Sequence, residues 1–289
     1  MLTDLSAVAR TGASLHAWRR RLQRWRRALL AEVTQPIYAL YGRRLLEQVM
    51  QRPPPRHVGI ILDGNRRFGR LSGLVDPVQV YAQGAQKLDD LLNWCGELSI
   101  PAVTLWVCST DNLERHPHEV AGILGALELK LRALVSDPRI HSRRVRVQAI
   151  GRLDVLPEST LAAIRTAEQA TAGYDAMVLS IAVAYGGREE IADAVREMLV
   201  EAMGSGASLS EIIAGVCPER IGRHLYLADA PEPDLIIRTS GELRLSGFLL
   251  WQSAYSEFYF SDVLWPAFRK IDFLRAVRAF QQRRRRYGR

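Results

Sequence analysis

The chain has 289 residues, and its 48% hydrophobic and 24% charged residues describe a folded globular protein and exclude a disordered chain. Its 39 basic and 31 acidic residues give a formal net charge of +8. It contains no run of about 18 uncharged apolar residues and no secretory signal, so we expect no membrane-spanning helix and a cytoplasmic protein. The three scattered cysteines, Cys95, Cys108 and Cys217, exclude a disulfide framework and a cysteine metal site.

The basic surplus is confined to the two ends of the chain. Residues 1–33 carry a net charge of +5 and residues 283–289 another +5, which leaves −2 for residues 34–282. A nucleic-acid-binding domain usually spreads its basic residues over one face of the fold. We therefore expect no nucleic-acid partner.

The N-terminal region has the pattern of an arginine-rich helix. Leu15, Trp18, Leu22, Trp25 and Leu29 form one helical stripe, with arginines between them. A basic helix with tryptophans on its apolar side suits peripheral contact with a membrane, here at its inner face. A helix packed on its own domain or on a partner is the alternative.

A second helical pattern, over residues 37–49, leads to Pro53-Pro54-Pro55. A proline run cannot continue a helix and marks a boundary. The sequence therefore predicts an Arg-rich helical extension over residues 1–55 and one folded domain over residues 56–289.

Apolar runs and helical patterns alternate after this boundary. The expected strands are His57–Leu62, Ala102–Cys108, Val145–Ile150, Met177–Ala184, Leu235–Ile237 and Tyr255–Phe260. The expected helices lie near residues 81–98, 117–135, 158–171, 188–203, 208–214 and 272–285. Short apolar strands separated by helices predict a single α/β domain with a central, mostly parallel six-stranded sheet flanked by helices.

Polar segments follow four of these strands, where ligands bind in open α/β sheets. They are Asp63–Phe68, Ser109–Arg115, Tyr185–Arg188 and Arg238–Ser246. Arginines, hydroxyls and glycine turns suit phosphate groups, and the Asp63 carboxylate suits magnesium. The segments together predict a site for one or two phosphorylated ligands. A dinucleotide fingerprint, a P-loop and a nucleophile elbow are all missing from the sequence.

Five ordered motifs give the chain a family resemblance. They are Asp63–Arg67, Ser109–Asn112, Tyr185–Arg188, Asp234–Glu242 and Phe248–Glu257, the last followed by Trp265-Pro266. They resemble the signature blocks of the cis-prenyltransferase, or undecaprenyl diphosphate synthase, family. The resemblance covers residues 56–289, which makes this segment the expected catalytic domain with the cis-prenyltransferase fold. Within the family the chain looks most similar to short-chain (2Z,6E)-farnesyl diphosphate synthases.

The resemblance implies a homodimer that uses Mg²⁺ to condense isopentenyl diphosphate with an allylic diphosphate and makes a cis double bond. Asp63 matches the catalytic aspartate and metal ligand, Glu257 the second metal ligand, and Asn112 the asparagine assigned to proton removal. Either Asn112 or the released diphosphate can take the proton. The residues that match substrate-binding positions are Gly64, Asn65, Arg66, Arg67, Phe68, Tyr81, Ser109, Thr110, Asp111, Leu113, Arg115, Arg238, Arg244, Leu245, Ser246, Arg286 and Gly288.

Product length is expected to depend on the apolar room for the growing chain. Val107 stands where long-chain members often have alanine, and extra methyl groups in a packed interior obstruct elongation. We therefore expect geranyl diphosphate as the primer and Z,E-farnesyl diphosphate as the product. A medium-chain (for example decaprenyl) cis-polyprenyl diphosphate synthase, an irregular lavandulyl-type coupling enzyme and an inactive partner subunit of a prenyltransferase are the alternatives.

Overall fold

The computed structural model describes residues 38–283. The chain divides into two units, Met1–Gln48 and Val49–Arg289, and residues 38–50 are helical, as the pattern before the proline run predicts. The expected arginine-rich helix and the tail residues Arg286 and Gly288 lie outside the described residues. Within residues 38–283, no helix has the length and apolar character needed to cross a membrane.

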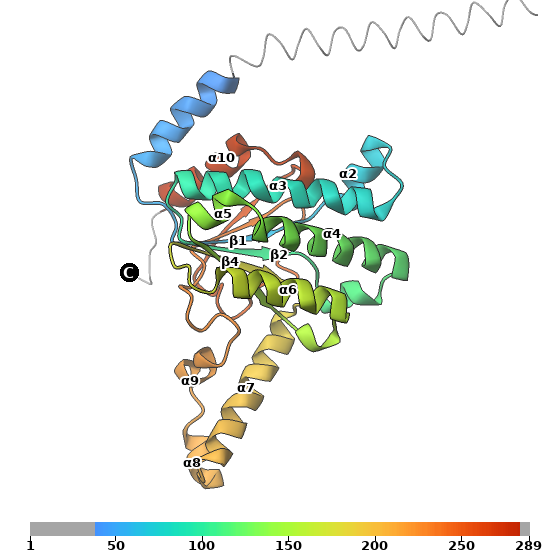
Figure 1. The fold of residues 1–289 in the computed structure, drawn as a ribbon. Helices are drawn as coiled ribbons and strands as arrows, with labels where there is room; N and C mark the ends of the chain where they lie inside the picture. Colours follow the sequence, from blue (N-terminus) through green and yellow to red (C-terminus); the bar gives the residue numbers. More distant parts are fainter. Residues whose placement is uncertain (1–37, 284–289) are drawn as a thin grey trace, which may run out of the picture. The chain divides into compact units, whose positions relative to one another are not determined.

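The second unit is built on one six-stranded sheet. Its strands are β1 (His57–Ile61), β2 (Ala102–Trp106), β3 (Val145–Ile150), β4 (Met177–Ala182), β5 (Leu235–Arg238) and β6 (Glu257–Phe260). Every pairing is parallel, and the order is β3-β4-β2-β1-β5-β6 (Figure 1). The six predicted strands are confirmed. The central strands are buried along their whole length, which explains why they are continuous apolar runs.

Two strands end two residues earlier than predicted, and β1, predicted to reach Leu62, ends one residue earlier at Ile61. The strand expected over Met177–Ala184 ends at Ala182, and Ala184 has a left-handed φ of 47° that turns the chain out of the sheet. The strand expected over Ala102–Cys108 ends at Trp106. Cys108, Val183 and Ala184 stay buried beyond these ends, so hydrophobicity alone did not reveal where strand pairing stops.

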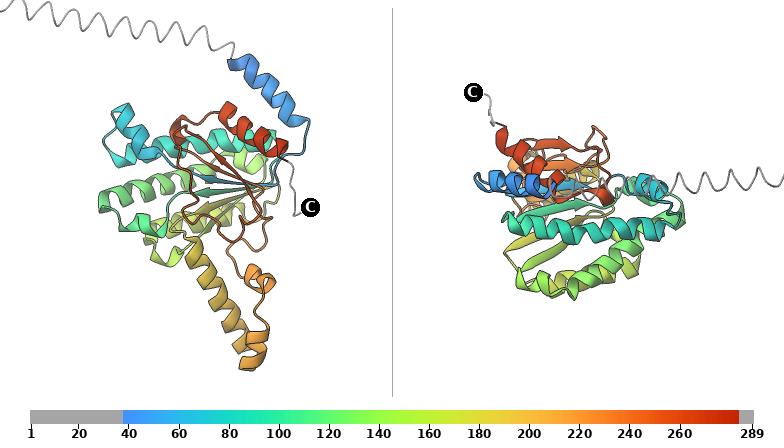
Figure 2. Two further views of the ribbon diagram at one scale, coloured as in Figure 1. Left: turned by 180° about the vertical axis from the view of Figure 1, so that it is seen from behind. Right: turned by 90° about the horizontal axis from the view of Figure 1, so that it is seen from above.

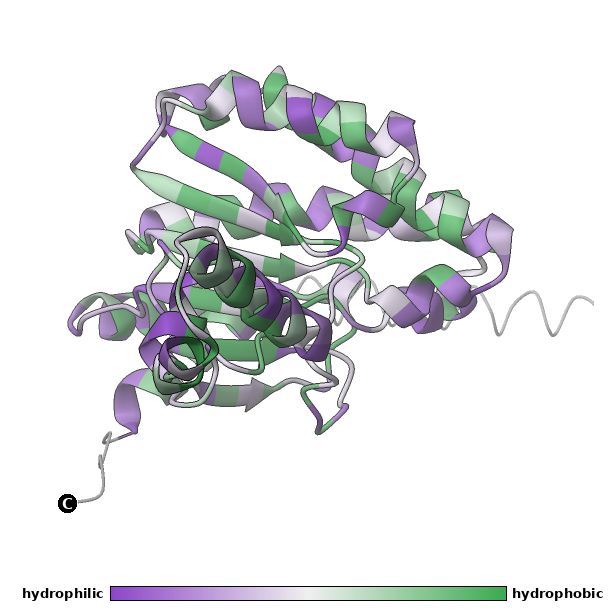
Figure 3. Ribbon diagram, turned by 90° about the horizontal axis from the view of Figure 1, so that it is seen from below, coloured by the Kyte–Doolittle hydropathy of each residue, from purple (hydrophilic) through white to green (hydrophobic). Residues whose placement is uncertain are grey.

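The helices cover both faces of this sheet. α3 (Pro77–Glu97), α4 (Pro117–Val135) and α6 (Glu158–Thr171) lie side by side on one face (Figure 1). α10 (Lys270–Gln282) lies against β5 and β6 (Figure 2). α7 (Gly187–Gly204) runs out beyond the sheet, and α8 (Leu209–Ala214) lies at its far end. The strands are largely hydrophobic, and the helices carry hydrophilic residues on part of their surface (Figure 3).

Three short helices do not follow from the hydrophobic pattern. They are α2 (Asn65–Ser72), α5 (Pro138–Ser142) and α9 (Pro218–Arg223). α5 and α9 each begin with a proline at their first position and have five and six residues, too few to show a helical period. Three 3₁₀ turns, Thr110–Glu114 (η1), Leu153–Val155 (η2) and Trp265–Ala267 (η3), complete the described elements.

An aromatic cluster closes the core beneath the loop that follows β5. Trp106 stacks on Phe248 with 5.4 Å between ring centroids, and Tyr185 meets both rings edge-on. Gly187 permits a close backbone approach here, because its N–H donates to Gly247 O at 3.0 Å and a Cβ at position 187 would lie 2.4 Å from that oxygen. The second glycine of the Gly-Gly pair after β4 is therefore explained by packing.

The carboxyl group of Glu190 is completely buried behind this cluster. It accepts hydrogen bonds from Gln252 Nε2 at 2.8 Å, from Tyr226 N at 3.0 Å and from the Tyr185 hydroxyl. Burial raises the pKa of Glu190 above its ordinary value, and these hydrogen bonds offset only part of that effect. The folded state therefore holds this proton more tightly than the unfolded chain does.

We predict that Glu190 makes the protein less stable as pH rises. Above the ordinary glutamate pKa of 4.5, the unfolded chain releases a proton that the folded protein still holds. The free energy of unfolding then falls until the pH passes the folded pKa of Glu190. Urea unfolding at a series of pH values should show this decline in the native protein and a smaller one in Glu190→Gln. If the free energy of unfolding falls equally steeply with pH in both proteins, the raised pKa does not belong to Glu190.

Candidate functional site

Three polar segments meet at the carboxyl ends of the central strands and line a cavity of about 630 Å³, here called the polar cavity. Segment Asp63–Arg67 follows β1, Ser109–Arg115 follows β2, and Arg238–Ser246 follows β5. The fourth predicted segment, Tyr185–Arg188, does not line this cavity. That part of the prediction fails because Tyr185 is buried in the core and does not face the cavity.

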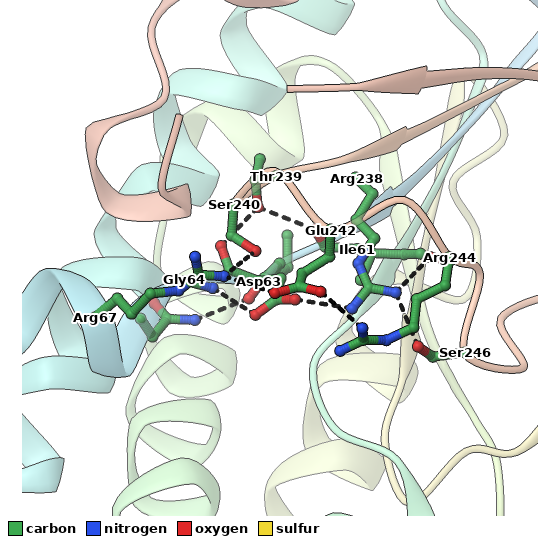
Figure 4. Close-up of polar contacts among 12 residues, drawn as sticks. Ile61, Asp63, Gly64, Arg67, Arg238, Thr239, Ser240, Glu242, Arg244 and Ser246 are labelled. Carbon is green, nitrogen blue, oxygen red and sulfur yellow. Dashed lines mark hydrogen bonds and ion pairs between the residues drawn. The ribbon is translucent and has the colours of Figure 1, made fainter. Parts of the chain in front are cut away.

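Asp63 and Arg238 form the central ion pair of the polar cavity. Arg238 Nη2 donates to Asp63 Oδ2 at 2.9 Å, and the Gly64 N–H donates to Asp63 Oδ1 at 2.7 Å (Figure 4). Burial tends to raise the pKa of Asp63, but the hydrogen bond and charge of Arg238, with bonds from Ser240 and Gly64, hold that pKa below its usual range. Asp63 is therefore a carboxylate at neutral pH.

Arg238 is almost completely buried and is oriented by the loop that follows β5. Its Nη1 donates to Ser246 Oγ at 2.8 Å and also to the carbonyl oxygen of Arg244. Ser240 and Ser246 have left-handed φ angles of 80° and 53°. Such backbone is strained for residues other than glycine and is concentrated at functional sites. The buried Nε–H of Arg238 has no partner among the described residues.

Glu242 joins the two sides of the polar cavity. Arg67 Nη2 lies 3.3 Å from Glu242 Oε1, and Arg244 Nη1 lies 2.7 Å from Glu242 Oε2 (Figure 4). Arg67 also donates to Ser240 Oγ at 2.8 Å. One carboxylate therefore spaces two exposed guanidinium groups that come from segments far apart in the sequence.

Gly64 lets helix α2 begin immediately after Asp63. It has a φ of 104°, and a Cβ there would lie 2.9 to 3.1 Å from Leu264, so another side chain would be strained at this position. α2 then begins at Asn65 and directs its first N–H groups toward the end of β1, where an anion is favoured. Asn65 Nδ2 donates to Leu62 O at 2.9 Å, which fixes the start of the helix.

Ser109 and Asn112 fix each other at the start of turn η1. Ser109 Oγ accepts from the Asn112 N–H at 3.2 Å, and Asn112 Oδ1 accepts from the Ser109 N–H at 3.3 Å. This reciprocal pair is a capping box. It uses the acceptor oxygen of Asn112 and leaves the amide group of the side chain as a donor.

Glu119 organises the side of the polar cavity near α3. It accepts from the Tyr81 hydroxyl at 2.9 Å and from Arg115 Nη1 at 2.8 Å, and Arg66 Nε lies 3.6 Å away. Burial and the neighbouring Glu119 raise the pKa of Tyr81, so this phenol stays protonated. Burial also tends to raise the pKa of Glu119, but Tyr81 and the two arginines lower it overall.

The charge of the polar cavity suits phosphate groups and a hard metal ion. Six arginines line it against the three carboxylates Asp63, Asp111 and Glu242. Mg²⁺ in proteins commonly binds one or two carboxylates together with substrate phosphates and water. Asp63, ionised beside an anion site, fits that donor set. Within residues 38–283, no three His, Cys, Asp or Glu side chains gather into a metal site.

A smaller cavity of about 60 Å³, here called the apolar cavity, lies between α3, α4 and the central strands. Five residues line both cavities: Leu62, Asn65, Tyr81, Val107 and Ile123. Val107 therefore stands at the junction of a polar and an apolar space. This arrangement matches a ligand with an anionic head and a hydrocarbon tail.

Most of the predicted site residues lie at the polar cavity, and some do not. Phe68, Thr110, Leu113 and Leu245 are outside its lining, and Leu245 packs against the aromatic core. Glu257 begins β6 and pairs in register with Leu235, whereas Arg238 and Ile61 are level with Phe260. Glu257 therefore lies about 10 Å before that level along the strand, and within one chain the sheet does not bring it to Asp63.

Three charged residues of the site were not predicted from the sequence. Arg70 lines the polar cavity one helical turn after Arg66 and Arg67 on α2. Glu119 follows Arg115 by four residues at the start of α4. The spacing of three or four residues on a helix could have revealed both. Glu242 lies inside a recognised motif, but its bridging of two arginines depends on the fold.

Comparisons with known proteins agree with the sequence motifs. A family model described as "Putative undecaprenyl diphosphate synthase" matches residues 61–288. An "Isoprenyl transferase" of Thermus thermophilus is 53% identical over 263 residues, which cover 91% of this chain and 99% of that protein. A "(2Z,6E)-farnesyl diphosphate synthase" of Thermobifida fusca is 50% identical over 253 residues, covering 88% of this chain and 97% of that one.

A solved structure has the same fold. The lavandulyl diphosphate synthase from Lavandula x intermedia, in complex with dimethylallyl diphosphate, superimposes with a TM-score of 0.75. It is 31% identical, and the match covers 82% of this chain and 99% of that one. These findings confirm the resemblance drawn from the motifs. The chain belongs to the undecaprenyl diphosphate synthase family of isoprenyl transferases.

Proposed function

We propose that this protein condenses isopentenyl diphosphate with geranyl diphosphate in a magnesium-dependent reaction that gives (2Z,6E)-farnesyl diphosphate. The observation that carries the proposal is the junction of an arginine-rich polar cavity with an apolar cavity through five shared residues. A prenyl diphosphate has an anionic head and a hydrocarbon tail, so it matches this pair of spaces.

The proposed reaction joins two carbon atoms and releases diphosphate. The terminal alkene carbon of isopentenyl diphosphate bonds to the allylic carbon of the primer. The allylic carbon–oxygen bond breaks, its electron pair leaves with the diphosphate, and a proton is lost from isopentenyl diphosphate to form the new double bond. Negative charge grows on the leaving diphosphate, so fixed cations around it lower the barrier.

The two substrates are assigned to opposite sides of Glu242. The allylic diphosphate is expected at the start of α2, where N–H groups and the exposed Arg67 favour an anion. Isopentenyl diphosphate is expected at Arg238, Arg244 and Ser246. Glu242, which bonds to both Arg67 and Arg244, supports a constant separation between the two sites.

Asp63 is the proposed magnesium ligand. Its lowered pKa keeps it ionised, and it lines the polar cavity. When bound, the ion would neutralise charge on the departing diphosphate. Arg238 positions the carboxylate through their 2.9 Å hydrogen bond. Glu257, the second proposed ligand, would need to be brought to the site from another chain.

The capping box favours the diphosphate over Asn112 as the proton acceptor. Asn112 Oδ1 already accepts from the Ser109 N–H, and a neutral amide is a weak base. The side-chain amide group remains free to donate to a diphosphate oxygen. We therefore assign Asn112 to orienting the released diphosphate, which then takes the proton.

A homodimer is part of the proposal and is supported by the exposed surface of helices α7 and α8. Val200, Met203, Leu209 and Ile213 are exposed large apolar side chains on these two helices. Exposed apolar groups of this kind mark protein–protein interfaces when they lie together. A second copy of the chain is the proposed partner.

We predict turnover of isopentenyl diphosphate with geranyl diphosphate when magnesium is present, and none after addition of a chelator. Dimethylallyl, geranyl and farnesyl diphosphate should be compared as primers, with product length and double-bond geometry identified by chromatography against standards. If none of the three primers supports turnover, the enzyme proposal is overturned and an inactive partner subunit is favoured. Longer products would instead indicate a polyprenyl diphosphate synthase, and branched products a lavandulyl-type coupling enzyme.

We predict that Arg238→Met lowers kcat/KM about 10²–10³-fold, the effect of removing one preorganised electrostatic donor. The pKa of Asp63 should rise, because burial then acts without the opposing guanidinium. The acid limb of the pH profile of kcat/KM should therefore move to higher pH. Arg144→Met, which removes a surface ion pair with Asp175, is the control. If the acid limb of Arg238→Met stays at the native pH, the proposal that Arg238 lowers the pKa of a catalytically required Asp63 is refuted.

We predict that Val107→Ala gives products longer than farnesyl diphosphate, because two methyl groups leave the junction of the two cavities. Radiolabelled product chromatography measures the chain lengths. Val58→Ala is a matched control, since Val58 is buried in β1 and lines neither cavity. An unchanged product in Val107→Ala would argue against control of length at this residue.

A further inference from the structure

The end of the apolar cavity farthest from Asp63 carries a charged side chain. Lys130, on α4, lines this cavity and is its one charged lining residue among those the structure describes. Its Nζ donates to Asp89 Oδ1 on α3 at 2.6 Å. Apart from Asn65 and Tyr81 at the junction, the other lining residues are apolar. A charge at the far end has no evident role in packing a hydrocarbon, so it requires a separate explanation.

Helix geometry places this ion pair at the far end. On α3 the lining runs from Tyr81 to Leu88, and on α4 from Ile123 to Lys130. Tyr81 and Ile123 also line the polar cavity, whereas Leu88 and Lys130 do not. Seven residues of helix span about 10 Å. The ion pair therefore lies two helical turns deeper than the junction at Val107.

Lys130 is held more firmly than a surface lysine. Its side chain is 12% exposed and that of Asp89 is 33% exposed. Arg139 Nη2, on α5, lies 3.6 Å from the same oxygen of Asp89. The apolar stem of a lysine can line a cavity while its ammonium group reaches a carboxylate at the edge. Here the stem contributes to the cavity lining and the charge links α4 to α3.

We propose that the Lys130–Asp89 ion pair is the floor of the prenyl cavity and, together with the bulk of Val107 at the junction, limits the length of the product. The inference rests on the proposed function, which places the hydrocarbon tail in the apolar cavity. A chain that grows past Leu88 must displace the lysine stem and separate a largely buried charge from its partner, which is unfavourable. A neutral side chain of the same size would be displaced more easily.

The test compares four variants with the native protein. Lys130→Ala removes the stem, Lys130→Met keeps its length without the charge, and Asp89→Ala removes the partner. Lys87→Ala is the matched control, because Lys87 forms a 2.7 Å ion pair with Asp90 on the same helix but does not line the cavity. Thermal unfolding should establish that each variant is folded before products are analysed.

We expect Lys130→Ala, Lys130→Met and Asp89→Ala to give products at least one isoprene unit longer than those of the native protein. Lys87→Ala should give the native product. Native product lengths in both Lys130→Ala and Asp89→Ala would overturn the proposal. The proposal would also be overturned if Lys130→Met gives the native product while Lys130→Ala gives a longer one. Side-chain bulk, and not the ion pair, would then form the floor.

A binding measurement separates this inference from the proposed reaction. The probes are the unreactive S-thiolodiphosphates of farnesol and geranylgeraniol, titrated by calorimetry without isopentenyl diphosphate. The native protein should bind the farnesyl compound at least about tenfold more tightly than the geranylgeranyl compound, a difference in binding free energy of about 1.4 kcal/mol. Lys130→Ala should remove most of this preference. An unchanged preference would refute the floor, whereas absent turnover with normal binding would refute only the reaction.

Discussion

The ion pair between Asp63 and Arg238 holds the site together, because it joins the ends of two neighbouring strands 175 residues apart in the sequence. It fixes the carboxylate at the end of β1 and turns the guanidinium toward Ser246 in the loop after β5. Breaking a buried pair by removing one partner costs about 3–5 kcal/mol. The proposed metal site and the proposed isopentenyl diphosphate site therefore share one interaction, and neither can be altered independently of the other.

Much of the fold follows from local sequence patterns. The six strands are short apolar runs bounded by polar residues, and a parallel sheet buried on both faces requires that pattern. The site also follows in part, because the carboxyl ends of parallel strands meet at one edge and bring Asp63, Asn112 and Arg238 to a common cavity. Helix α2 does not follow, since Asp63-Gly64-Asn65 has the composition of a turn and the helix depends on the φ of Gly64.

The remaining features depend on which strands and helices become neighbours. Glu242 binds Arg67 only because β5 lies beside β1, and Lys130 reaches Asp89 only because α4 packs against α3. Local periodicity contains no information on such pairings. Glu257 illustrates the same limit: its motif is clear in the sequence, but the parallel register places it at the opposite end of the sheet from Asp63.

The capping box at η1 has a consequence for how this segment can vary. Asn112 closes the turn with its carbonyl oxygen and lines the polar cavity, so in the proposed function one side chain serves both folding and binding. Aspartate would keep the cap but add negative charge beside the proposed diphosphate site, and serine or threonine would offer a single hydrogen to donate. Asparagine therefore meets both demands at this length, and replacing it would trade local order against affinity.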